Sequence, residues 1–327
     1  MVPRYWKLTL LSICVLGACG STDELPPAAE PARAPPATER PVGRVVPVGN
    51  KPEGLVADER TGLVAVALTD PDQLALVDAR SGRVERRVPL PESPRHLQLE
   101  QAGGPVLVPA ERANALVRVD LPGGRTERID VGRFPHDAAA AGERIFVGDE
   151  LGDTVSVIEG GRVIERLEAP IQPGGVVATG SNTRIAVVAV RERVVELFDA
   201  GNLRSLGKAD AGVGPTHVVS DGRDLLYVVD TQGDALLLFH LSPRLELVRR
   251  VYLEGAPYGI AIDRRRRRLW VTLTERNRVV ELSAGGQPRV LRSFPTVRQP
   301  NTVSVDEKSG RVFVASRADG TLQLFDP

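Results

Sequence analysis

A proline returns at nearly constant spacing through most of this 327-residue chain. The intervals between successive members of the series are 42, 41, 38, 42, 42 and 43 residues. Each proline precedes three short apolar runs separated by turns, and then a more polar fourth run. A repeat of about forty residues with three or four strands in each unit is typical of a β-propeller. The prolines are Pro52, Pro94, Pro135, Pro173, Pro215, Pro257 and Pro300.

The composition of the runs predicts strands. Val, Leu and Ile dominate the first three runs of each unit, as they do in β-strands. The run at residues 74–77 (LALV) is apolar on both faces, as a strand packed between two blades has to be. The fourth runs, such as residues 83–90 and 162–167, alternate charged and apolar residues. That alternation is typical of a half-exposed outer strand.

The two ends of the repeat region predict how the ring closes. The seventh unit stops at Pro327 after its third run and lacks a fourth. Residues 43–49 (GRVVPVG) precede the first repeat proline and resemble the fourth runs of other units. We therefore predict an all-β fold: a seven-bladed β-propeller over residues 43–327, whose last blade is completed by an N-terminal strand at about 43–49. Closure in this way leaves no free sheet edge between the first and last blades.

Two units carry a recognisable motif. Residues 144–149 (RIFVGD) are followed by residues 153–159 (DTVSVIE), and the fifth unit contains residues 226–230 (LYVVD). This pattern resembles the YVTN-repeat, or YncE-like, bacterial propellers, in which an aromatic-Val-Thr-Asn strand precedes a Thr-Val-Ser-Val-Ile-Asp strand. The resemblance spans residues 44–327 and implies the propeller fold, but it implies no activity. None of the units keeps the family asparagine, and Asp149 and Asp230 are the nearest substitutes.

The N-terminus has the features of an export signal. Arg4 and Lys7 precede an apolar run at residues 8–16 that is too short to span a membrane as a helix. The run ends in Leu-Gly-Ala-Cys19, which resembles the bacterial lipobox. We predict a lipoprotein signal peptide over residues 1–18 and lipidation of Cys19. The alternative is ordinary signal cleavage near residue 18, with an incidental cysteine.

Residues 19–42 are rich in Pro and Ala and are predicted to form an extended tether. The protein is then expected in the cell envelope, exported and held to a membrane by its lipid on the periplasmic or extracellular side. Cys19 would be the single cysteine of the mature chain, so no internal disulfide is expected. The mature chain carries 40 basic and 42 acidic side chains, a balance that does not favour a nucleic-acid partner.

The residues after each repeat proline are the first candidates for a site. In a propeller they lie at the loops entering the innermost strands and are expected to point toward the axis. Three of the four histidines in the chain occupy these positions. The loops between the second and third strands add acidic residues to the same face, including Glu111 and Glu150. We predict these ligand-binding candidates: His96, His136, Asp137, Asp149, His217, Asp230, Tyr258 and Asn301.

A metal is one interpretation of the histidines. Imidazole and carboxylate are ligands for divalent transition metals, and His96, His136 and His217 could meet only near the axis. The alternative is a packing role, in which each ring bonds a neighbouring backbone carbonyl. No HExxH or CxxC spacing supports the metal. We therefore expect no cofactor, and a divalent metal remains the open alternative.

Three functions remain open. The first is a binding module that offers its polar axial face to a protein, peptide, glycan or small molecule. The second is a metal-dependent lyase or lactonase that uses the histidines, although no residue is assigned a catalytic role. The third is a structural envelope protein. Residues 264–268 are five consecutive arginines that either contact anionic lipid head groups or form a solvated turn on the opposite face.

Overall fold

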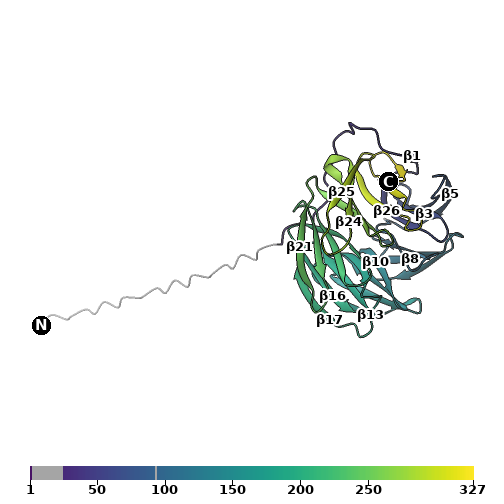
Figure 1. Ribbon diagram of the computed structural model, residues 1–327. Helices are drawn as coiled ribbons and strands as arrows, with labels where there is room; N and C mark the ends of the chain where they lie inside the picture. Colours follow the sequence, from purple (N-terminus) through teal and green to yellow (C-terminus); the bar gives the residue numbers. More distant parts are fainter. Residues whose placement is uncertain (2–24, 93) are drawn as a thin grey trace.

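The protein is a ring of seven four-stranded antiparallel sheets (Figure 1). This computed structural model describes residues 1, 25–92 and 94–327. The seven-bladed propeller predicted from the sequence is confirmed. The predicted signal peptide and the Cys19 lipidation site lie outside the described residues, apart from Met1.

The strands of each blade follow one another outward from the axis, and the last blade borrows β1. The innermost strands are β2 (Pro52–Asp58), β6 (Gln98–Leu99), β10 (Pro135–Ala141), β14 (Pro173–Thr179), β18 (Pro215–Ser220), β22 (Pro257–Asp263) and β26 (Pro300–Val305). The second strands are β3 (Leu63–Leu68), β7 (Val106–Ala110), β11 (Arg144–Asp149), β15 (Arg184–Ala189), β19 (Leu225–Asp230), β23 (Arg268–Leu273) and β27 (Val312–Ser316). The third strands are β4 (Gln73–Asp78), β8 (Ala115–Val119), β12 (Thr154–Glu159), β16 (Val194–Asp199), β20 (Ala235–His240), β24 (Arg278–Ser283) and β28 (Thr321–Phe325). The outer strands are β5 (Val84–Pro89), β9 (Thr126–Asp130), β13 (Arg162–Glu168), β17 (Ser205–Asp210), β21 (Glu246–Tyr252), β25 (Val290–Pro295) and β1 (Arg44–Pro47), and a short 3₁₀ turn η1 (Thr274–Arg276) follows β23.

Burial follows this order. The second strand β3 is buried at every position, whereas the outer strand β17 is exposed at five of six. The core lies between blades: one cluster joins Tyr227 and Val229 of one blade to Leu269 and Val271 of the next. Apolar packing between the second and third strands of neighbouring blades therefore holds the ring together, and the polar outer strands face solvent.

The repeat proline begins the innermost strand in six blades, and in the remaining blade Pro94 makes an isolated bridge to Ala110. Directly after the proline the ladder shifts register, as between Pro135 and Asp137. A β-bulge of this kind re-aims a side chain and bends the strand. The bulge therefore turns His136, and its equivalents in other blades, toward the axis. We call the end of the ring where these strands begin the upper face, and the opposite end the lower face.

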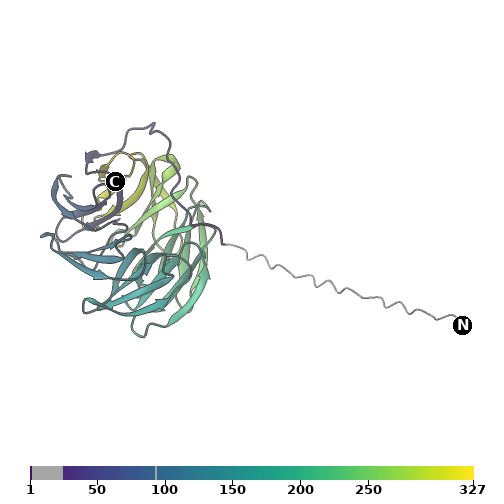
Figure 2. The same cartoon turned by 180° about the vertical axis from the view of Figure 1, so that it is seen from behind.

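The ring closes through its N-terminal strand, as predicted. β1 pairs with β28 in antiparallel register, from Arg44 opposite Leu324 to Pro47 opposite Thr321. Figures 1 and 2 both show the purple N-terminal strand beside the yellow C-terminal ones. The strand itself is shorter than the predicted segment, because residues 48 and 49 follow it outside the ladder.

A substitution after β1 tests how much this closure stabilises the ring. Val48 is fully buried against the first and last blades. Val48→Ala is expected to lower the free energy of unfolding by about 2 kcal/mol, because it leaves a cavity at the seam. Val45→Ala, in β1 at an exposed site, is the matched control and should change it by less than about 0.5 kcal/mol. Chemical denaturation measures both; equal effects would contradict a packed seam.

Residues 25–42, which belong to the predicted extended tether, pack in part against the propeller. Ala29 and Ala34 are buried, and Val42 bonds Pro295 at the start of the seam. Pro and Ala are too weakly apolar for their pattern alone to predict burial, so this contact depends on partners elsewhere in the fold.

No helix in the described part of the chain is long and apolar enough to cross a bilayer.

Candidate axial site

Three imidazoles and a phenol ring lie together at the axis. The ring centroids of His96 and His217 lie 4.4 Å apart, and those of His96 and His136 lie 4.6 Å apart. Tyr258 packs edge-on against His217 at 4.5 Å. The Nε2 atoms of His96 and His217 are 3.0 Å apart, within hydrogen-bond distance. Four residues predicted from the sequence therefore converge, although they come from four different blades.

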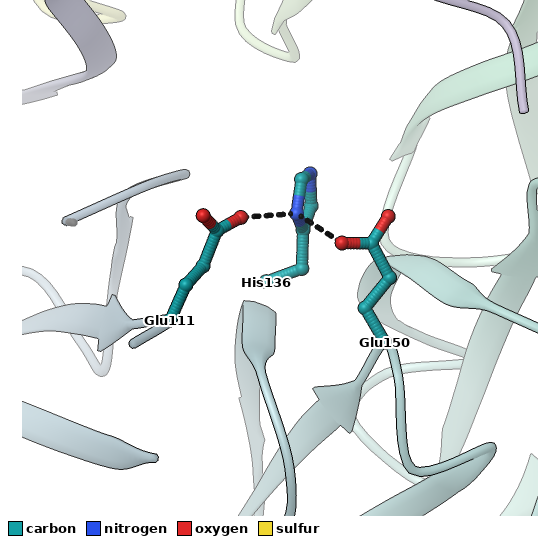
Figure 3. Close-up of side chains that lie close together, drawn as sticks. All are labelled: Glu111, His136 and Glu150. Carbon is teal, nitrogen blue, oxygen red and sulfur yellow. Dashed lines mark hydrogen bonds and ion pairs between the residues drawn. The ribbon is translucent and has the colours of Figure 1, made fainter. Parts of the chain in front are cut away.

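His136 is held between two carboxylates (Figure 3). Its Nδ1 lies 2.8 Å from Oε1 of Glu111 and 3.1 Å from Oε2 of Glu150. Both glutamates follow second strands, and the amide of Glu150 donates to the carbonyl of Phe134, two residues before His136. This backbone bond fixes the loop so that the carboxylate reaches the imidazole. All three residues are buried.

A series of ion pairs connects Glu111 to further charged side chains around the axis. Arg95 lies 3.0 Å from Glu111 and 3.3 Å from Glu53, measured from guanidinium nitrogen to carboxylate oxygen. Arg317 bonds the other oxygen of Glu53 at 2.6 Å. Three cations thus face three carboxylates, since His136 and Glu150 complete the set. We call these residues, with Glu111, the axial ion cluster.

The charges set unusual pKa values. Burial opposes the charged form of His136, but the Glu150 carboxylate and hydrogen bonds to both glutamates outweigh it and raise its pKa to about 9. Burial also opposes charge on Glu150, yet the His136 charge and its hydrogen bond lower that pKa to about 2. Burial, with the charges of His136 and Arg95, lowers the pKa of His217 to about 3. The pKa of His96 is also well below normal, first from burial and then from its neighbours His217 and His136.

The raised pKa of His136 predicts an alkaline loss of stability. Its proton stabilises the fold fully below the ordinary value of 6.5, and this contribution is lost as the pH rises through about 9. The free energy of unfolding should therefore fall between pH 6.5 and 9, and His136→Gln should flatten that fall. Denaturant titrations at intervals across this range measure it. An unchanged slope in the variant would contradict the assignment.

The predicted three-histidine metal set does not form. Within the described residues, the group that brings three ligand atoms within 4.8 Å of one another is Glu111, His136 and Glu150. His96 and His217 instead pair with each other through Nε2. The physical reason is that the acidic loops reach His136 first and hold its Nδ1. The axial ion cluster therefore pairs its cationic side chains with an equal number of carboxylates.

An axial cavity of about 560 Å³ lies below the imidazoles. His96, His217, Gln98 and Asp137 lie at its inner end, and backbone and apolar side chains of the innermost strands form its walls. Burial raises the pKa of Asp137 to about 6, although Gln98 and the amide of Val176 bond its carboxylate. The rim includes Glu59, Arg264, Arg265 and Glu307. We call this space the axial channel.

The five consecutive arginines belong in part to the rim of the axial channel. Arg264 bonds Glu307 of the next blade at 2.9 Å, and Arg265 bonds Glu59 of the first blade at 2.6 Å, past the seventh blade. Arg266 reaches Asp263 and Arg268 reaches Glu281. The run lies on the lower face, as predicted, and its paired guanidinium groups brace the mouth of the channel.

A second hollow, of about 410 Å³, lies above the imidazoles. Glu53, Arg95, Arg317, Tyr258 and Asn301 line it from the propeller. Glu30, Pro31 and Arg33 line it from the N-terminal segment. His96 borders both hollows, so the imidazole layer separates an upper, charged space from the lower channel.

Two predicted ligand-binding carboxylates lie elsewhere. Asp149 and Asp230 are fully buried, so they do not lie on the accessible binding face where we expected them. Asp149 accepts hydrogen bonds from Thr154 and Ser156, and Asp230 accepts from the amides of Gly214 and Gly233. Asp149 thus bonds hydroxyl groups of the next strand, β12, and Asp230 bonds backbone amides of two loops, so both carboxylates are used within the fold.

Sequence reasoning overlooked several polar members of the site. Glu53 and Arg95 occupy the predicted axial positions, but only their pairing with Glu111 and Arg317 reveals their role. Gln172 bonds Glu150 from the residue before a repeat proline, a position that could have been searched. Gln98 lies four residues after Pro94, where no local signal marks it.

Comparisons with known proteins establish the fold alone. No family model matches the chain, and no curated protein matches it. Hydrazine synthase from Kuenenia stuttgartiensis matches with a TM-score of 0.74 at 13% identity, covering 85% of this chain and 96% of that one. Virginiamycin B lyase from Staphylococcus aureus matches with a TM-score of 0.71 at 15% identity, covering 87% and 99%. A chain of a mitotic checkpoint complex matches with a TM-score of 0.76 at 12% identity, covering 98% and 99%.

Proposed function

We propose that this protein is a lipid-anchored, extracytoplasmic binding protein whose axial channel takes a small amphipathic molecule. The observation that carries the proposal is the channel itself. Its volume of about 560 Å³ falls in the range of small-molecule sites, which is roughly 300–1,000 Å³. Its lining combines apolar side chains of the innermost strands with polar groups, which lie both at the imidazoles and at the rim. A ligand would place its apolar body along the strands and its polar head at the imidazoles.

The polar end is suited to hydrogen bonding rather than to ion pairing. The depressed pKa values of His96 and His217 keep both rings neutral at physiological pH. A neutral imidazole offers one donor and one acceptor. The charged residues of the axial ion cluster already bond one another. We therefore favour a ligand with an uncharged head, such as an amide, ester or hydroxyl.

The proposed anchor suits this arrangement. Leu25 accepts a hydrogen bond from Arg191, next to β15. Cys19 lies six positions before Leu25, a reach of at most about 20 Å. Lipidation of Cys19 would therefore hold the upper face near the membrane and turn the mouth of the axial channel away from it.

A thermal-shift screen tests the proposal. The full mature chain would be heated with a library of amphipathic compounds of matched size, half with uncharged and half with anionic heads. A ligand that binds only the folded state raises Tm with concentration. We expect stabilising compounds among the uncharged set, and no shift when Ala57→Phe narrows the channel. Equal shifts in that variant, or none in the wild type, would contradict the proposal.

A metal-dependent lyase or lactonase is the second candidate. The close approach of Glu111, His136 and Glu150 is the observation that favours it, because these residue types bind divalent cations. Such a metal would polarise a carbonyl or leaving group, while the neutral imidazoles moved protons. Metal analysis of the purified chain and of Glu150→Gln tests it. About one equivalent in the wild type and none in the variant would favour the enzyme.

A further inference from the structure

The N-terminal segment is bound to the upper face through its backbone. The amide of Ala34 donates to Oε1 of Gln299 at 2.8 Å, and Nε2 of Gln299 donates to the carbonyl of Ala32 at 2.8 Å. One side-chain amide thus bonds both a donor and an acceptor of the segment's backbone. This is how a peptide-binding site recognises an extended chain independently of its side chains.

A hydrogen bond within the propeller holds Gln299, the residue that binds the segment, in position. Oδ1 of Asn277 accepts from the amide of Gln299 at 3.0 Å, and its Nδ2 donates to the carbonyl of Pro35 at 2.9 Å. Asn277 takes a left-handed φ of 49° after η1, a conformation that asparagine tolerates well. Its side chain therefore orients Gln299 and binds the segment with the same amide group.

The side chains of the segment fit the groove because they are small. Ala29 and Ala34 are buried, and Ala28 packs against a core cluster of two blades. Half of the residues between and after them, up to residue 42, are Pro or Ala. Pro-rich chains are already extended, so they lose little conformational entropy when they bind. Only Glu39, bonded to Arg278, adds an ion pair near the end of the segment.

We propose that the upper face carries a peptide-binding groove for extended Pro- and Ala-rich segments, and that residues 25–42 are its resident, displaceable occupant. The segment forms one wall of the upper hollow through Glu30, Pro31 and Arg33. Its release would expose Tyr258 and Asn301, and with them the upper side of the imidazole layer. The segment is thus a lid over the upper face, independent of any ligand in the axial channel.

Two matched substitutions test the lid in the full mature chain. Ala34→Glu places a long charged side chain at a buried position, whereas Ala37→Glu places the same side chain at an exposed position of the same segment. Hydrogen exchange should show a protected amide at position 34 in the wild type and in Ala37→Glu. We expect Ala34→Glu to lose that protection while the blades keep theirs. Exchange at the rate of a free chain in the wild type would overturn the proposal.

A labelled synthetic peptide of residues 25–40 tests the groove. In the wild type the resident segment competes at the high effective concentration of a tethered ligand. Fluorescence anisotropy should therefore show binding at least about tenfold tighter to Ala34→Glu than to the wild type. Adding Gln299→Leu to Ala34→Glu should remove the binding. A peptide that fails to bind Ala34→Glu, or that binds equally without Gln299, would overturn the proposal.

Discussion

Replacing Arg95 with methionine is expected to lower the free energy of unfolding by about 3–5 kcal/mol. The guanidinium lies between Glu53 and Glu111, and both carboxylates are largely buried. Methionine keeps the apolar part of the side chain, but it removes one of the cations that pair with these two carboxylates. Breaking a buried pair is costly because the surviving charge cannot regain its water. Denaturant unfolding at pH 6.5 would measure the change.

Two further variants separate charge from packing. Arg83→Met removes an exposed arginine that pairs with Glu85 on an outer strand, and it should cost less than about 1 kcal/mol. Adding Glu111→Gln to Arg95→Met should recover part of the lost stability, because it removes one uncompensated charge. If Arg95→Met were no more costly than Arg83→Met, the axial ion cluster would not hold the blades together.

Narrowing the axial channel is expected to abolish binding of a small probe. Ala57 lies in β2 and lines the channel, so Ala57→Phe directs a ring into the space. For an uncharged N-phenylnaphthylamine probe that binds the wild type, we expect an affinity loss of at least about 100-fold, because overlap excludes a ligand from a site of this size. A fluorescence titration measures the loss directly.

A second channel variant controls for misfolding of Ala57→Phe. Ala102 is exposed at the channel, so Ala102→Trp should narrow the mouth without disturbing the core. Ala37→Trp, on the exposed N-terminal segment, controls for added aromatic surface. Unchanged probe affinity in both channel variants would show that the probe binds elsewhere. Loss in Ala102→Trp with unchanged unfolding would confirm entry from the lower face.

The architecture was predictable because it repeats. The repeat prolines recur at nearly one spacing and begin the innermost strand in six blades, so this spacing predicts both the blades and the axial positions of His96, His136 and His217. Closure followed from the missing fourth strand of the seventh unit, which β1 supplies by pairing with β28. These features are local or periodic, and sequence patterns report them well.

The chemistry of the site was less predictable because it depends on pairs between blades. The bulge explains why His136 points inward, but not that Glu111 and Glu150 hold its Nδ1. Asp149 was predicted to bind a ligand because it stands at the end of a strand. In the structure, the hydroxyl groups of Thr154 and Ser156 bond its carboxylate instead. Docking of the N-terminal segment depends on Gln299, more than 260 residues away.

Native mass spectrometry of the chain extracted from its own membranes tests the central proposal most directly. The wild type and Ala57→Phe would be compared after gentle release from detergent. We predict a small bound molecule, in up to one equivalent, in the wild type and none in the variant, together with the mass of a lipid on Cys19 in both. The proposal of an axial binding protein would be contradicted if the wild type and Ala57→Phe carried the same bound mass. It would also be contradicted if neither carried a bound molecule, even after incubation with compounds that raise Tm.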